Sequence, residues 1–132
     1  MNNRANFPLP RSVALILAGV FMVIILYTST KPTPHVQGLH QSLVDHILDY
    51  AHFPMYALLT LLLLLVFCSF DIRRQVAAFT IAMFFGILNE VVQSVVPGRS
   101  CSFHDILVNA MGAFFVIVLI NFIRKYPKTI KT

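Results

Sequence analysis

Four long apolar runs, at residues 12–30, 50–70, 76–96 and 103–123, dominate the chain. An α-helix rises about 1.5 Å per residue, so each run is long enough to cross the ~30 Å hydrocarbon core of a bilayer. Only 11% of the residues are charged, against about 25% in a typical soluble domain. The sequence therefore predicts an all-α membrane protein, a single domain over residues 1–132 built as a four-transmembrane-helix bundle.

A short amphipathic helix is expected to lead into the second span. Lys31 is followed by Pro32 and Pro34, which end the first helix because the residue before a proline disfavours helical geometry. In the stretch that follows, apolar and polar residues separate onto two faces, the pattern of a helix at the membrane interface or at the outer end of a span. The apolar face holds Leu39, Leu43, Val44, Ile47, Leu48 and Ala51, and the polar face His40, Gln41, Asp45, His46 and Asp49.

The first apolar run, which follows Arg4 and Arg11, also resembles a secretory signal peptide. No cleavage site of the Ala-x-Ala kind follows it, and its apolar core is long. We therefore interpret the run as a permanent span.

Basic residues predict the orientation of the four spans. Cytoplasmic loops of membrane proteins are enriched in Lys and Arg, whereas the first and third loops here carry only Lys31 and Arg99. We expect both termini and the middle loop to be cytoplasmic, in a bacterial-type cytoplasmic (inner) membrane. The basic residues adjoin the apolar runs, so we interpret the net charge of +5 as setting the orientation of the spans in the membrane. No nucleic-acid partner is expected. The residues on the cytoplasmic side are Arg4, Arg11, Arg73, Arg74, Arg124, Lys125, Lys128 and Lys131.

This topology brings the start of the second span, the end of the third and the start of the fourth to the outer face. Glu90 then lies about 9 Å below the outer end of its span, while the opposite halves of these spans are nearly free of polar groups. We expect a ligand-binding polar layer in the outer leaflet. Its predicted members are His52, Tyr56, Glu90, Gln93, Arg99, Asp105 and Asn109.

Glu90 is the member that is hardest to explain by structure alone. A carboxylate near the bilayer centre costs about 2.5 kcal/mol or more, so it needs a partner or access to water. Asp105 has a structural alternative, because Ser102 and Asp105 match a capping box. The other members also have structural alternatives: interhelical hydrogen bonds for Gln93 and Asn109, interfacial anchoring for His52 and Tyr56, and charge neutralisation or a lipid phosphate for Arg99.

This string of polar residues resembles the VanZ-like family of small membrane proteins. The resemblance covers about residues 49–123. The chain departs from the family pattern at two places: Leu48–Asp49–Tyr50 replaces the family's Asp-Lys element, and Val116 replaces a second glycine. It implies a membrane fold and an association with resistance to the lipoglycopeptide teicoplanin. The matching residues are His52, Tyr56, Glu90, Gln93, Pro97, Gly98, Arg99, Ser102, Asp105, Asn109 and Gly112.

The leading functional hypothesis is an envelope protein that binds an amphiphile: a lipid headgroup, a cell-wall lipid intermediate or a lipoglycopeptide. The first alternative is an intramembrane enzyme acting on a lipid-linked substrate, with Glu90 or Asp105 as general base and His52 as acid. The second is a small drug/proton transporter. No metal and no cofactor are expected, because His52, Glu90, His104 and Asp105 lack the close spacing of a metal site. The oligomeric state stays open, since Gly86 and Gly112 would allow close helix contacts within or between chains.

Overall fold

The computed structural model describes residues 9–31, 39–97 and 102–125, with residues 39–49 described as backbone only. It contains α1 (Arg11–Ser29), α2 (Leu39–Phe67), α3 (Ile72–Gln93) and α4 (Phe103–Lys125). Each of the four includes a stretch long and apolar enough to cross a membrane. The predicted all-α, four-helix membrane fold is confirmed, and the chain is a multi-pass membrane protein.

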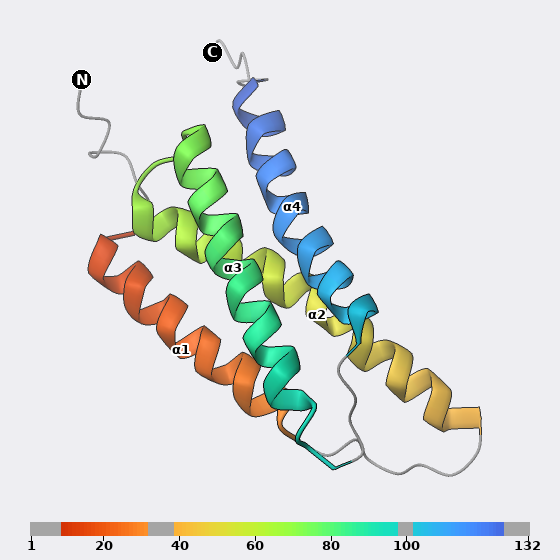
Figure 1. Cartoon of the computed structure of the whole chain (residues 1–132). Coiled ribbons are helices and arrows are strands. Elements are labelled where there is room, and N and C mark those ends of the chain that lie inside the picture. The colour runs from red at the N-terminus through yellow and green to blue at the C-terminus, as the bar shows by residue number, and fades with distance from the viewer. Residues whose placement is uncertain (1–8, 32–38, 98–101, 126–132) are drawn as a thin grey trace.

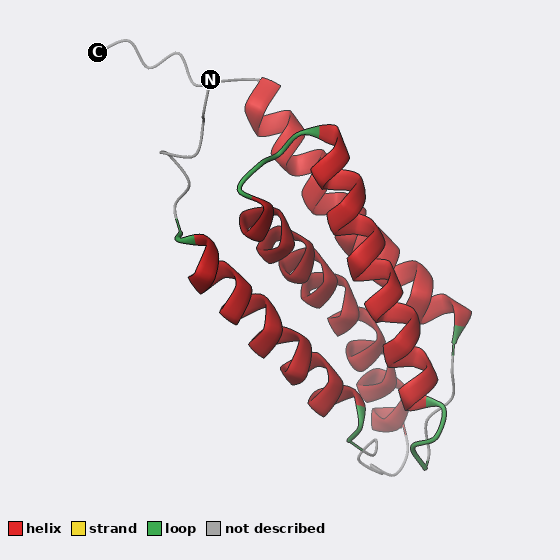
Figure 2. Cartoon of the chain, turned by 60° about the vertical axis from the view of Figure 1, so that its left-hand side comes forward, coloured by secondary structure: helices red, strands yellow, loops and turns green. Residues whose placement is uncertain are grey.

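The helices run alternately up and down (Figure 1). The start of α1, the α2–α3 turn and the end of α4 lie at one end of the bundle; we call this the turn end. The end of α1, the end of α3 and the start of α4 lie at the opposite end, which we call the site end. α2 packs against each of the other three helices, whereas α1 contacts α2 and touches α3 only slightly (Figure 2). This is the alternation that the sequence predicts, and the side of the membrane that each end faces stays a prediction.

The expected amphipathic helix is the first part of α2 rather than a separate element. α2 runs without a break for 29 residues, about 44 Å at 1.5 Å per residue, and its first turns extend away from the bundle (Figure 1). The faces predicted for residues 39–49 involve side chains outside the described part. Pro54 lies inside α2 and removes one helical hydrogen bond, because proline has no backbone N–H.

Small residues bring α2, α3 and α4 close together. Ala78 and Ala82 are fully buried on α3, and Gly86 continues the same face one turn later. On α4, Gly112 lies so close to α2 that a Cβ placed there would collide with the backbone carbonyl of Phe53. Both glycines thus serve helix contacts within the chain, as small residues do in membrane proteins.

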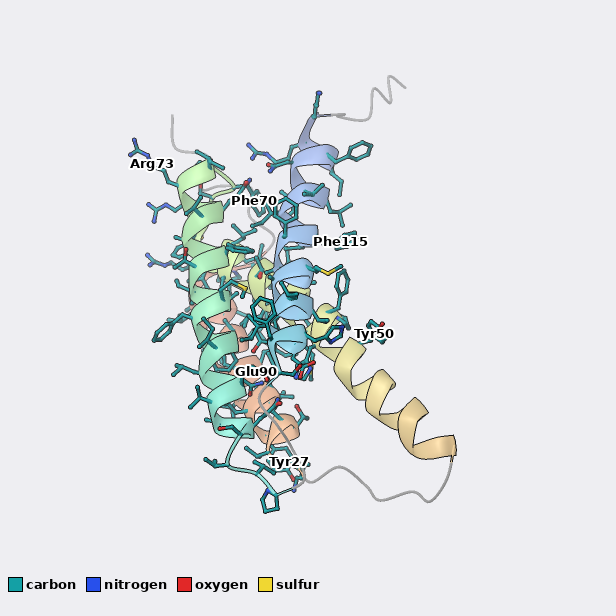
Figure 3. All side chains as sticks on the ribbon, turned by 45° about the vertical axis from the view of Figure 1, so that its right-hand side comes forward. Tyr27, Tyr50, Phe70, Arg73, Glu90 and Phe115 are labelled. Atoms are coloured by element: carbon teal, nitrogen blue, oxygen red, sulfur yellow. The ribbon has the colours of Figure 1, made fainter. Side chains whose placement is uncertain are left out.

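A polar cluster at the turn end corrects the expectation that these halves are nearly apolar. The side-chain amides of Gln75 and Asn121 exchange two hydrogen bonds, at 2.8 and 3.0 Å, and so join the start of α3 to the end of α4. The carbonyl of Phe70 accepts from Gln75 Nε2 at 2.8 Å and from Arg124 Nη1 at 2.7 Å. Figure 3 labels Phe70 at this end of the bundle. Each amide is both donor and acceptor to the other, so this cluster holds α3 and α4 together at the turn end.

Candidate functional site

Most of the predicted site residues gather inside the bundle at the site end. Figure 3 shows Glu90 in the interior, far from Arg73 at the turn end. The side chains form three successive layers along the helix axes. These are the end layer (His52 and Gln93), the middle layer (Glu90 and Ser102) and the inner layer (Tyr56 and Asn109).

The end layer joins α2 to α3. His52 and Gln93 are 5% and 1% exposed, and their Nε2 atoms are 3.5 Å apart. The donor and acceptor roles in this contact depend on the tautomer of the His52 ring. The contact therefore links a buried imidazole of α2 to a buried amide of α3.

The middle layer joins α3 to the start of α4. Glu90 is fully buried, and its Oε2 accepts a hydrogen bond from the backbone N–H of Ser102 at 3.3 Å. The Ser102 hydroxyl in turn accepts from the backbone N–H of His104 at 3.2 Å, so Ser102 caps α4 as predicted. In a capping box, the Asp105 side chain would also accept a hydrogen bond from the backbone N–H of Ser102. That part of the prediction is wrong, because the Ser102 N–H donates to Glu90 instead.

Asp105 instead lies beside its neighbour His104 at the edge of the site. The Nδ1 of His104 is 3.6 Å from Oδ1 of Asp105, and Asp105 is only 8% exposed. His104 is exposed, and its ring packs edge-on against Tyr50 of α2, with 6.4 Å between the ring centres. Asp105 thus combines near-complete burial with an imidazole neighbour, a pairing that a helix cap alone does not require.

The inner layer lies about one helical turn deeper than Glu90. Tyr56 and Asn109 are both fully buried. A Cβ placed on Gly86 would lie 3.2 Å from Cε1 of Tyr56 and 3.3 Å from Nδ2 of Asn109, so the two side chains converge on this glycine. Neither the Tyr56 hydroxyl nor the nitrogen or oxygen of the Asn109 amide has a hydrogen-bond partner among the described residues. Leaving such a buried group unsatisfied costs about 1–3 kcal/mol.

Sequence reasoning missed the contribution of the first helix. Nδ2 of Asn89 donates to the hydroxyl of Ser29 at 3.0 Å, and both residues are buried. Ser29 lies at the site end of α1, at the level of the other polar groups, which is the signal that would have found it. The hydroxyl of the neighbouring Thr28 donates to carbonyls of its own helix. Of these two hydroxyls, only that of Ser29 bonds to α3.

Six of the seven predicted site residues lie in the described part of the chain, and the structure brings them to one end of the bundle. Arg99 lies outside the described residues. Within the described ranges, no three His, Cys, Asp or Glu side chains are placed to hold a metal ion. The six residues are His52, Tyr56, Glu90, Gln93, Asp105 and Asn109.

Comparison with known proteins identifies the family. The model of the VanZ/LLP1 family matches residues 10–124, which include all but the last residue of α4 and the whole of the other three helices. The chain belongs to the VanZ/LLP1 family. The match confirms the resemblance seen in the sequence and extends it to α1, the VanZ/LLP1 helix that carries Ser29. No curated protein and no solved structure matches the chain.

Proposed function

We propose that this VanZ/LLP1 protein binds an amphiphile at the site end of the bundle. The observation that carries the proposal is the Asn109 amide, which is fully buried and has no hydrogen-bond partner for its nitrogen or oxygen among the described residues. A buried polar group with no partner is costly, and a ligand group placed beside it recovers that cost. The candidate ligands are a lipid headgroup, a cell-wall lipid intermediate and a lipoglycopeptide.

The neighbouring side chains offer the rest of such a site. Glu90 supplies acceptor capacity in the middle layer, while Gln93 and His52 supply amide and imidazole groups nearer the helix ends. Arg99, in the α3–α4 connection, would hold a phosphate or carboxylate through paired N–H groups. With the positive-inside orientation, these groups face the outer leaflet of a bacterial-type cytoplasmic membrane, where envelope lipids and glycopeptide antibiotics meet the protein.

Access requires the helices to part at the site end, because the polar groups are now covered. Glu90, Asn89 and Asn109 are all 0% exposed. The contacts that would have to yield include three between elements at this end: Asn89 to Ser29, Gln93 with His52, and Ser102 to Glu90. Interhelical hydrogen bonds in membranes average about 0.6 kcal/mol, a cost that a bound amphiphile can offset.

A capture experiment tests the proposal. The protein is reconstituted in lipid nanodiscs, and binding is measured with immobilised lipid precursor and with immobilised teicoplanin. Glu90→Gln and Arg99→Ala are expected to weaken capture about tenfold each, as for loss of a charge-assisted contact. Arg73→Ala, at the turn end, is the matched control and is expected to bind like the wild type. Unchanged binding by both site variants would contradict the proposal.

An intramembrane enzyme is the second candidate. It is favoured by the buried His52, which contacts Gln93, and by the fully buried Glu90 in the adjacent layer, because acid–base catalysis needs two titratable groups near one substrate. Turnover of a labelled lipid-linked precursor by the reconstituted protein, abolished in Glu90→Gln, would support it. Binding without turnover would rule out the enzyme and support the amphiphile-binding proposal.

A further inference from the structure

The inner layer differs chemically from the two layers above it. Its available polar atoms are the Tyr56 hydroxyl and the two ends of the Asn109 amide, all of them uncharged. A hydroxyl both donates and accepts, and a carboxamide offers a donor nitrogen and an acceptor oxygen. The layer is therefore matched to a neutral ligand group that itself both donates and accepts.

We infer that the inner layer is a subsite that selects amphiphiles whose acyl chain is joined through a secondary amide. The inference rests on the proposed function and adds the chemical class of ligand. In a trans amide the N–H and C=O point in opposite directions, so they need partners on two sides. Tyr56 approaches from α2 and Asn109 from α4, and the two side chains converge on Gly86 of α3.

The surroundings of the inner layer fit the linkage of such a molecule. Toward the helix ends lies the middle layer, about 6 Å away for the four residues from Gly86 to Glu90; it is suited to a polar head. In the other direction Leu59, Ala82 and Ala113 are all fully buried, and the hydroxyl of the buried Thr60 is bonded to the Tyr56 carbonyl of its own helix. A head, an amide and a hydrocarbon chain would then occupy the middle layer, the inner layer and the apolar core in that order.

Gly86 makes this geometry available. A Cβ at position 86 would lie 3.2–3.5 Å from the Tyr56 ring and 3.3 Å from Asn109 Nδ2, so it would crowd both side chains. A ligand amide therefore enters between Tyr56 and Asn109 only when the helices part, as access to the proposed site already requires. An ester in the same place keeps its carbonyl but lacks the N–H, so the Asn109 oxygen would stay without a donor. One hydrogen bond of this kind contributes about 0.5–1.5 kcal/mol.

The test uses two probes that differ only in the linkage. N-dodecanoylethanolamine carries a secondary amide, and ethylene glycol monododecanoate carries an ester in its place. Each is titrated separately against the full chain in nanodiscs, with bound probe counted by native mass spectrometry. The wild type is expected to bind the amide about three- to tenfold more tightly than the ester.

Variants assign the preference to the inner layer. In Asn109→Leu the affinity for the amide is expected to fall to that for the ester, and Tyr56→Phe is expected to reduce the ratio in part. Asn121→Leu removes a carboxamide from the same helix at the turn end, and it is expected to keep the full preference even where it lowers stability.

Two results would overturn the inference: equal affinity for both probes in the wild type, or a preference that survives in Asn109→Leu. With equal affinity, the proposed amphiphile binding still stands. If a folded wild type binds neither probe, the proposed function and the inference both fail.

Discussion

The backbone N–H of Ser102 donates a hydrogen bond to Oε2 of Glu90, with 3.3 Å between the nitrogen and the oxygen. The contact ties the buried carboxylate of α3 to the residue that caps α4. It also means that Glu90 has a structural role beside any role in binding. Substitutions at this position therefore have to distinguish its charge from its hydrogen-bonding capacity.

Glu90→Leu is expected to lower the free energy of unfolding by about 1–3 kcal/mol, because the Ser102 N–H would lose its acceptor in a water-poor site. Glu90→Gln keeps an acceptor oxygen and is expected to cost less. Reversible unfolding in mixed micelles measures both, with the lipid-facing Val91→Leu as a control expected to be neutral. Equal losses in the two Glu90 variants would show that the charge, rather than the hydrogen bond, matters for stability.

The glycines are expected to rank by what a new methyl group would meet. Gly112→Ala should destabilise most, by about 1–3 kcal/mol or more, because the obstruction is the Phe53 backbone, which cannot move aside cheaply. Gly86→Ala should cost less, since the nearest atoms are side-chain atoms of Tyr56 and Asn109 at 3.2–3.3 Å. Gly19→Ala on α1 meets nothing within 4 Å and serves as the control. Thermal unfolding in one detergent gives the order, and Gly19→Ala ranking with Gly112→Ala would contradict it.

The Ser29–Asn89 bond is expected to show measurable coupling between α1 and α3. A double-mutant cycle with Ser29→Ala and Asn89→Ala should give about 0.6 kcal/mol, in line with other interhelical hydrogen bonds in membranes. The same cycle with Thr28→Val in place of Ser29→Ala should give no coupling, because Thr28 bonds only to carbonyls of its own helix in the described structure. Equal coupling in both cycles would rule out a specific bond.

Asp71 is expected to make stability depend on pH at the turn end. The Ser69 hydroxyl and then the backbone N–H of Arg74 donate to this carboxylate, and they hold its pKa below the usual value. A pKa that is lower in the folded state gives stability that is present above the unfolded value of about 3.9 and is lost as the pH falls through the folded value. Melting temperatures measured on acidification should fall for the wild type and change less for Asp71→Asn. Identical acid profiles would contradict this assignment.

Cysteine labelling tests the predicted orientation. Cys68 lies at the α2–α3 turn and is a free, partly buried thiol. In a Cys101→Ser background, a membrane-impermeant maleimide should fail to label Cys68 in intact cells and should label it in inverted membrane vesicles. Labelling in intact cells would place the termini and the middle loop outside.

The sequence was sufficient for the fold and for most of the polar cluster. Length and hydropathy determine four spans, and alternation alone then brings His52, Glu90 and Asn109 to the same end. The depth of each group also follows from its position along its helix, because the rise per residue is constant.

Partners could not be predicted in the same way, because they depend on how each helix is rotated and shifted against its neighbours. Local spacing assigned the Ser102 N–H to Asp105, yet a residue twelve positions earlier, Glu90, accepts it. The bonds from Gln75 to Asn121 and from Asn89 to Ser29 span 46 and 60 positions. No local pattern in the sequence contains such distances.

The burial of polar groups on α3 has a consequence for how the protein is made. Asn89, Glu90 and Gln93 all lie near the end of α3, and the groups that cover them come from α1, α2 and α4. If α3 entered the bilayer before α4 packed against it, this end of α3 would meet lipid without the groups that cover it in the folded protein. Such exposure is costly. We therefore expect α3 and α4 to enter the bilayer as a pair.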